Sequence, residues 1–262
     1  MHDIVKSYIY DKDIKLKIAF INKSIEEISK AQNFSEEEKS LFASSALFAA
    51  IYATEQKDDK GSVYASFKYP KQRLSLTAVC ETDGRLRGYS EEYSSSTVSE
   101  NEVLLVAGIR LAVRGEYQSA VVADNPEDLV SIYYKNSNQT KAKVRFIEKD
   151  GIKALIIAEY LPGHYVNYKT DDKKPSTEMI DEKLKSTMNI AYEIAMAEIE
   201  SYKISSVNHE KIKQLADIEI SFGCTCSKRK IKEAIISCQE DIELPFEATC
   251  KLCGKVYTIN EI

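Results

Sequence analysis

Short runs of apolar residues, separated by turn residues, recur along the first part of the chain. Such runs predict β-strands, here at residues 14–21, 63–69, 74–81, 85–89, 102–107, 143–149 and 152–160. Asp83-Gly84 and Asp150-Gly151 each separate two of these runs, and an Asp-Gly pair between two strands predicts a hairpin. The polar stretch 90–100, which contains three consecutive serines, predicts a loop. We therefore expect mostly antiparallel strands.

Three helices are expected among these strands. The capping-box patterns from Ser24 to Glu27 and from Ser35 to Glu38 predict the starts of two of them. The second, expected over 36–54, is apolar on nearly all sides, which predicts that it is buried against a sheet. The third is expected to begin after Asn125, because a proline and two acidic residues follow this cap, and to end at Asn136.

Beyond the charged stretch 169–175 the pattern changes. Apolar residues spaced by three and four predict a long amphipathic helix over 176–202. Further helical pieces are expected at 210–216 and 229–237, and a closing strand at 255–259. The chain is thus predicted to have an α+β fold in three parts: an N-terminal domain over 1–172 with a mixed or antiparallel sheet and packed helices, a helical linker over 173–219, and a small C-terminal domain over 220–262.

Composition and charge are those of an ordinary globular protein. Of the 262 residues 44% are hydrophobic and 29% charged, with a net charge of −5 and an isoelectric point near 5.5. Charge-driven binding of nucleic acid or an anionic membrane needs a basic surface, so neither partner is expected. The N-terminus has no apolar segment typical of a signal peptide, and the longest apolar run, 41–53, is too short to span a bilayer. We therefore expect a cytoplasmic protein.

Four of the six cysteines form two short clusters near the C-terminus. These are Cys224-Thr225-Cys226 and Cys250-Lys251-Leu252-Cys253, with 23 residues between them. Two close cysteine pairs that the intervening chain can bring together predict a zinc site, since Zn²⁺ prefers four tetrahedral sulfur ligands. Such a site has no open position for a substrate. The alternative is that these cysteines are simply buried or disulfide-bonded.

Other candidate chemistry is sparse. Cys80 lies in a predicted strand and Cys238 at the end of a predicted helix, so both are expected to be buried structural thiols. His2 is terminal, His164 lies in a predicted turn, and His209 is expected at the surface. The sequence has no glycine-rich phosphate loop, no nucleophile elbow and no paired-histidine motif. We therefore expect no enzymatic activity.

Oxidation would change the predicted zinc site. Zinc-bound thiolates are available to oxidants, and their conversion to disulfides would remove the ligands and release the metal. A module of this size has little core of its own, so zinc would supply much of its folding free energy. The C-terminal domain can therefore act as a folding switch operated by oxidation.

Further motifs accompany the two cysteine clusters. The first cluster continues with Ser227-Lys228-Arg229, and the second is followed by Lys255-Val256-Tyr257. The N-terminal motifs are Asp83 to Tyr89, Gly115 to Gln118, Glu127 to Leu129 with Tyr133-Tyr134, Ser137 to Thr140, and Leu161 to Gly163. With these motifs the chain resembles the 33-kDa chaperonin family of redox-regulated bacterial holdases, and their order and spacing fit nearly the whole chain.

The resemblance implies an ATP-independent chaperone that prevents aggregation of unfolding proteins under oxidative stress. In the reduced state Cys224, Cys226, Cys250 and Cys253 would hold one zinc ion per chain. Oxidation would form the disulfides Cys224–Cys226 and Cys250–Cys253, release zinc, and unfold the switch domain and the linker. The uncovered apolar stretch 180–202 would then bind unfolded or oxidatively damaged client proteins. The family also implies a possible homodimer on activation.

Several positions depart from the family pattern. Ser95-Ser96 and the segment 100–102 lie where glycines are usual, Ser119 replaces a glycine, and Asn138 replaces a glutamate. None of these positions is a predicted zinc ligand, so the departures bear on client range, dimer geometry and activation threshold.

Two rival hypotheses stay open. The first is a constitutive protein-interaction scaffold with a purely structural zinc site, which would keep its metal under mild oxidation. The second is a thiol-disulfide oxidoreductase that uses Cys250 and Cys253. The second is disfavoured because these cysteines lack the strand–helix setting of a thioredoxin-like motif.

Overall fold

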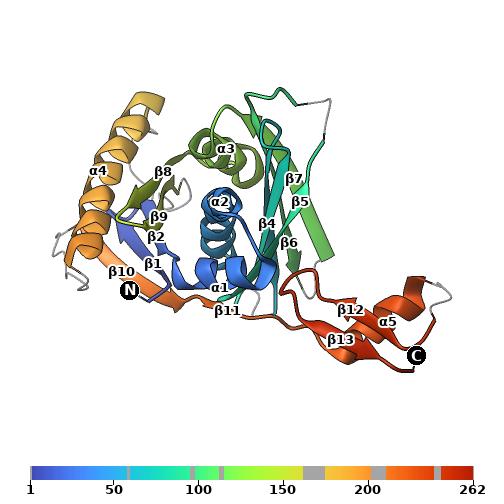
Figure 1. The fold of residues 1–262 in the computed structure, drawn as a ribbon. Coiled ribbons are helices and arrows are strands. Elements are labelled where there is room, and N and C mark those ends of the chain that lie inside the picture. The colour runs from blue at the N-terminus through green and yellow to red at the C-terminus, as the bar shows by residue number, and fades with distance from the viewer. Residues whose placement is uncertain are drawn as a thin grey trace.

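The computed structural model describes residues 2–57, 60–94, 98–111, 115–161, 175–201, 211–238 and 243–261. Two large sheets face each other with helices between them, and a further helix covers the outer face of the first sheet (Figure 1). This arrangement confirms the predicted α+β class.

The first sheet has the strand order β10-β1-β2-β9-β8, and all neighbouring strands are antiparallel. Its strands are β1 (Ile4–Tyr10), β2 (Ile14–Phe20), β8 (Ala142–Lys149), β9 (Ile152–Tyr160) and β10 (Ile212–Glu219). β9 is buried along nearly its whole length because both faces of the sheet are covered. This double burial explains why its sequence is almost continuously apolar.

The second sheet has the strand order β11-β5-β4-β3-β6-β7. Its strands are β3 (Ser62–Tyr69), β4 (Leu74–Glu81), β5 (Arg85–Glu92), β6 (Val103–Leu111), β7 (Gly115–Ala123) and the short β11 (Ser221–Phe222). β11 pairs with β5 in parallel, whereas the other pairs are antiparallel. The two Asp-Gly turns connect β4 to β5 and β8 to β9, with Gly84 and Gly151 at φ of +89° and +75°. Both predicted hairpins are thus confirmed.

Helices α1 (Lys23–Gln32), α2 (Glu36–Ala53) and α3 (Pro126–Tyr133) lie between the sheets, and a π-helix (Tyr134–Asn138) follows α3. The predicted capping box at the start of α2 is confirmed, with the Ser35 hydroxyl accepting from the Glu38 N–H at 3.2 Å. α2 is enclosed by the core shared by both sheets, which explains why it is apolar on all sides.

Helix α4 (Thr177–Ser201) packs on the outer face of the first sheet, opposite α2. Its buried residues recur at the predicted spacing: Leu184, Met188, Ala191, Ala195 and Ile199. They form a second apolar core with β2 and β9. The predicted long amphipathic helix is therefore confirmed, and its apolar stripe is covered by the sheet.

Two local predictions are wrong. Residues 212–216 are not helical but belong to β10, which pairs with β1 along its length. The segment has apolar residues three apart, as in a helix, yet pairing with an open sheet edge satisfies its backbone. Ser24 does not cap α1 either. The carboxylate of Asp3 accepts from the backbone N–H groups of Asn22, Lys23 and Ser24 at 2.8, 3.0 and 2.6 Å.

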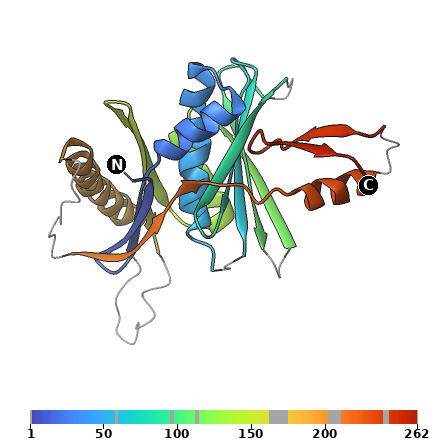
Figure 2. The same cartoon turned by 60° about the horizontal axis from the view of Figure 1, so that its bottom comes forward.

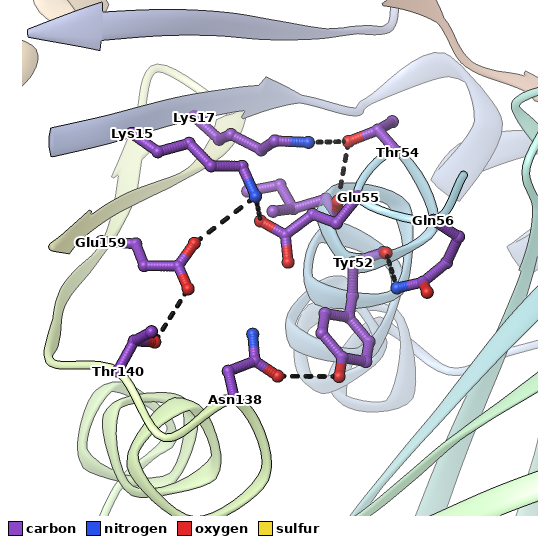
Figure 3. A network of polar contacts seen from close by, with 10 residues as sticks. Lys15, Lys17, Tyr52, Thr54, Glu55, Gln56, Asn138, Thr140 and Glu159 are labelled. Atoms are coloured by element: carbon purple, nitrogen blue, oxygen red, sulfur yellow. Dashed lines mark hydrogen bonds and ion pairs between the residues drawn. The ribbon is translucent and has the colours of Figure 1, made fainter. Parts of the chain in front are cut away.

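A buried polar network lies where the C-terminal end of α2 meets the first sheet (Figure 3). The Lys15 ammonium lies 2.7 Å from the Glu55 carboxylate and 3.4 Å from that of Glu159. Lys17, only 3% exposed, instead donates to the neutral hydroxyl of Thr54. Burial lowers the pKa of Lys17 to about 8. Lys17 therefore carries an unfavourable charge at neutral pH.

Candidate metal centre

The cysteine-containing segment begins where the chain crosses from the first sheet to the second (Figure 2). After β10 the N–H of Ile220 donates to the carbonyl of Asp3 at 2.9 Å, and β11 then pairs with β5. Gly84 lies directly under this crossing, since a Cβ on it would lie 2.1 Å from the carbonyl oxygen of Glu219. The close approach and the positive φ both require glycine there. The first cysteine pair thus follows a segment anchored to both sheets.

Three elements make up the rest of this module: α5 (Lys228–Cys238), β12 (Phe246–Thr249) and β13 (Val256–Ile259). The hydroxyl of Ser227 accepts from the N–H of Lys230 at 3.3 Å and so caps α5. β12 and β13 pair as an antiparallel hairpin, and the second cysteine pair lies in its connection. The predicted helix and closing strand are confirmed, whereas β12 was not predicted.

The second cysteine pair lies in a tight turn. The carbonyl of Cys250 accepts from the N–H of Cys253 at 3.3 Å and from that of Gly254 at 2.8 Å. The N–H of Cys250 in turn donates to the carbonyl of Lys255 at 2.8 Å, which closes the hairpin. Gly254 has φ of +70°, a left-handed conformation that favours glycine. Backbone hydrogen bonds therefore hold Cys250 and Cys253 close together.

The four predicted cysteines come together. All four sulfur atoms lie within 4.8 Å of one another. Cys224 Sγ is 3.8 Å from Cys250 Sγ, and Cys226 Sγ is 3.5 Å from Cys253 Sγ. These distances far exceed a disulfide bond of about 2.05 Å. They are close to the spacing of about 3.8 Å between sulfurs of a tetrahedral site with Zn–S bonds of about 2.3 Å. The cluster therefore fits a four-coordinate metal ion.

The hydroxyl of Tyr257 lies beside the cluster, 3.1 Å from Cys226 Sγ and 3.2 Å from the Cys226 carbonyl oxygen. Burial alone would raise the pKa of Cys226, but hydrogen bonds from Tyr257 and from the neighbouring thiols lower it to about 7. Burial raises the pKa of Cys224 and that of Cys253. The cluster thus favours the thiolate at Cys226, and a bound cation would favour it at every sulfur.

The other candidate residues lie elsewhere. Cys80 is fully buried on β4, as predicted, and burial raises the pKa of its thiol. The side chain of Cys238 and the whole of His164 and His209 lie outside the described residues. Within the described ranges the four cysteines are the one group of His, Cys, Asp or Glu residues arranged to hold a metal. Tyr257 belongs to the Lys255-Val256-Tyr257 motif of the family resemblance, but its contact with Cys226 could not be predicted from sequence because it depends on the hairpin fold.

Two of the departures from the family pattern have defined places in the fold. Ser119 pairs with Ala107 between β7 and β6, away from the cysteines. Asn138 ends the π-helix, and its side-chain oxygen accepts from the hydroxyl of Tyr52 at 3.0 Å (Figure 3). Neither residue is part of the metal centre.

Comparisons with known proteins agree with this architecture. A family model described as "Hsp33 protein" matches residues 3–260. The "33 kDa chaperonin" of Shewanella loihica is 24% identical over 278 residues, covering 99% of this chain and 93% of the relative. A crystal structure of the 33 kDa chaperonin of Thermotoga maritima superimposes with a TM-score of 0.70 at 14% identity, covering 99% of this chain and 95% of that one. Among the described residues, no helix is both long and apolar enough to cross a membrane.

Proposed function

The chain belongs to the Hsp33 protein family and is a non-enzymatic chaperone with a four-cysteine cluster that can hold a metal; from this premise we propose that it is an ATP-independent holdase switched on by oxidation. The reduced chain holds one Zn²⁺ ion through Cys224, Cys226, Cys250 and Cys253 and stays inactive. The oxidised chain binds unfolded or oxidatively damaged proteins in the cytoplasm, as a possible homodimer. The proposal retains the three-part division into residues 1–172, 173–219 and 220–262.

The cysteine cluster is the observation that carries the proposal. Zinc, when bound, ties the two cysteine pairs of the module together as one tetrahedral centre. Two-electron oxidation of Cys224 with Cys226, and of Cys250 with Cys253, forms two disulfides. Two molecules of hydrogen peroxide accept the four electrons with four protons and become water. The disulfides are no longer metal ligands, and the small module loses the centre that stabilises it.

The apolar face of α4 is the proposed client surface. In the closed form α4 covers the outer face of the first sheet with side chains such as Leu184, Met188 and Ile194, each at most 7% exposed. Separation of α4 from β2 and β9 uncovers two apolar surfaces at once. Contiguous apolar patches of this kind bind unfolded chains.

The decisive experiment follows zinc content and chaperone activity together in the full chain. Peroxide or hypochlorite should release one zinc ion per chain, detected with a colorimetric chelator, while light scattering of a thermally unfolding client decreases. Cys80→Ala is a matched control, since it removes a thiol that is buried away from the cluster. This variant should release zinc and gain activity as the unmodified chain does.

The opposite result would favour the scaffold hypothesis. A constitutive scaffold keeps its metal and its circular dichroism spectrum under mild oxidation. If the zinc-free, oxidised chain fails to slow client aggregation, the holdase proposal is wrong for this protein.

A further inference from the structure

Lys251, between the two cysteines of the second pair, reaches the N-terminal part of the molecule. Its ammonium forms an ion pair with Glu91 on β5 and lies 4.3 Å from the centre of the Tyr89 ring on the same strand. A carboxylate beside an aromatic face is a combination that binds an alkylammonium or guanidinium group. β5 thus presents a cation site that a residue of the same chain occupies.

The backbone around Lys251 is also recognised. The side-chain amide of Gln32, at the end of α1, donates to the carbonyl of Lys251 at 3.0 Å. Gly254 packs so closely on α1 that a Cβ there would lie 2.4 Å from the carbonyl oxygen of Ala31. The surface therefore binds a cationic side chain together with the peptide backbone that carries it.

A shallow hollow of about 430 Å³ continues from this contact. Its lining is mostly polar, with Phe34 and Leu74 as its apolar side chains and Glu91 as the acid that faces Lys251, while Glu92 is ion-paired with Arg73 in the same lining. Phe34 and Leu74 pack against the main core, so part of the wall of the hollow is apolar. An apolar side chain next to a bound cation would enter this hollow.

We propose that this surface, the Lys251 cradle (Gln32, Tyr89, Glu91 and the adjoining hollow), is a second client-binding site. It takes extended segments in which a lysine or arginine lies next to an apolar residue. Lys251 occupies it in the reduced chain as a built-in competitor. This inference rests on the proposed function, because withdrawal of the cysteine module empties the cradle. Lys251 and Glu91 are 59% and 44% exposed, so their contact is weak enough to be exchanged for a client.

The test uses fluorescence anisotropy with the full chain. The probes are a labelled unstructured peptide of Gly, Ser, Phe and Lys, and a twin in which Glu replaces each Lys. The oxidised, zinc-free chain should bind the lysine peptide more tightly than its twin. Glu91→Gln and Tyr89→Leu should each weaken binding of the lysine peptide about threefold, and together about tenfold, without changing binding of the glutamate twin. Glu116→Gln is the matched control, since it removes an exposed, ion-paired acid on β7 at the other edge of the same sheet. It should change neither affinity.

A second arm does not depend on oxidation. Lys251→Ala in the reduced, zinc-loaded chain removes the competitor and should increase binding of the lysine peptide but not of its twin. Zinc content and aggregation suppression are measured on the same samples, so failure of the redox switch is seen separately. The cradle inference is overturned if Lys251→Ala leaves lysine-peptide binding unchanged. It is also overturned if oxidised chains bind both peptides alike while releasing zinc and suppressing aggregation.

Discussion

The ion pair between Glu198 on α4 and Lys6 on β1 offers the most direct test of how α4 is held. The two charged groups lie 2.8 Å apart, and their side chains are 5% and 2% exposed. Burial raises the pKa of Glu198, while the hydrogen bond from Lys6 opposes that rise. This pair lies beside the apolar contacts of α4, so its loss acts on the docking of the helix.

Glu198→Ala leaves the Lys6 ammonium buried without its carboxylate partner. Removing one member of a buried ion pair lowers protein stability by about 3–5 kcal/mol. Asp217 lies opposite Lys6 in the β1–β10 pairing and is a nearby acid that can partly replace the lost charge. We therefore expect the lower end of this range. Glu200→Ala is the matched control on the same helix, because Glu200 pairs with Lys149 at side-chain exposures of 60% and 35%. An exposed pair of this kind contributes less than about 1 kcal/mol.

Hydrogen exchange of the α4 amides, measured in the reduced, zinc-loaded chain, is the assay. Glu198→Ala should accelerate exchange along α4 by about a hundredfold, as expected for a loss of about 3 kcal/mol. It should also give measurable aggregation suppression without oxidant. The double variant Lys6→Met with Glu198→Leu replaces the pair by apolar side chains and should restore slow exchange. Equal exchange rates in Glu198→Ala and Glu200→Ala would refute the reasoning.

Three further predictions concern other parts of the molecule. Lys17→Met should be more stable than the unmodified chain at pH 7, by up to about 3 kcal/mol. Because the pKa of Lys17 is about 8 in the folded chain against 10.5 when exposed, this advantage should vanish as pH rises from 8 to 10.5 in paired denaturant titrations. Gly84→Ala should lower the thermal midpoint of unfolding and speed zinc loss. Gly151 is also at positive φ but has nothing within 4 Å of an added Cβ, so Gly151→Ala should lower the stability by only about 1 kcal/mol. Tyr257→Phe removes a hydrogen bond to Cys226, so the pKa of that thiol should rise above about 7 and alkylation of the reduced, metal-free chain at pH 7 should slow. Unchanged alkylation would contradict that assignment.

The elements predicted correctly are those whose signal is local. α2 carries its own capping box, and the long helix α4 has an apolar stripe at helical spacing. The two Asp-Gly hairpins and the four clustered cysteines are likewise defined by residues close in sequence. For these features, neighbouring side chains and backbone preferences determine the structure.

The features that sequence reasoning missed depend on residues far apart in the chain. Asp3, which precedes β1 and is about twenty residues away in sequence, caps α1, so no capping pattern near Ser24 could reveal it. β10 is a strand because β1 presents an open edge, although its own apolar spacing is closer to that of a helix. Lys251 stands between two cysteines in the sequence, and its cation site exists only after β5 and α1 have come together.

β10 explains how a change in the cysteine module could reach α4, although the module and α4 lie on opposite sides of the two large sheets (Figure 1). The strand is at the edge of its sheet, and most of its side chains are exposed, so backbone pairing with β1 rather than apolar burial holds it. Edge elements with few buried contacts open at the lowest free-energy cost. Its C-terminal end is fixed by the Asp3 and Gly84 contacts, which come just before the first cysteine pair. In the proposed switch, unfolding of the cysteine module frees that end. β10 can then separate from β1 one hydrogen bond at a time, and the sheet edge next to the Lys6–Glu198 pair becomes open to water. In the proposed switch, a strand held mainly by backbone pairing therefore lies between the cysteine module and α4.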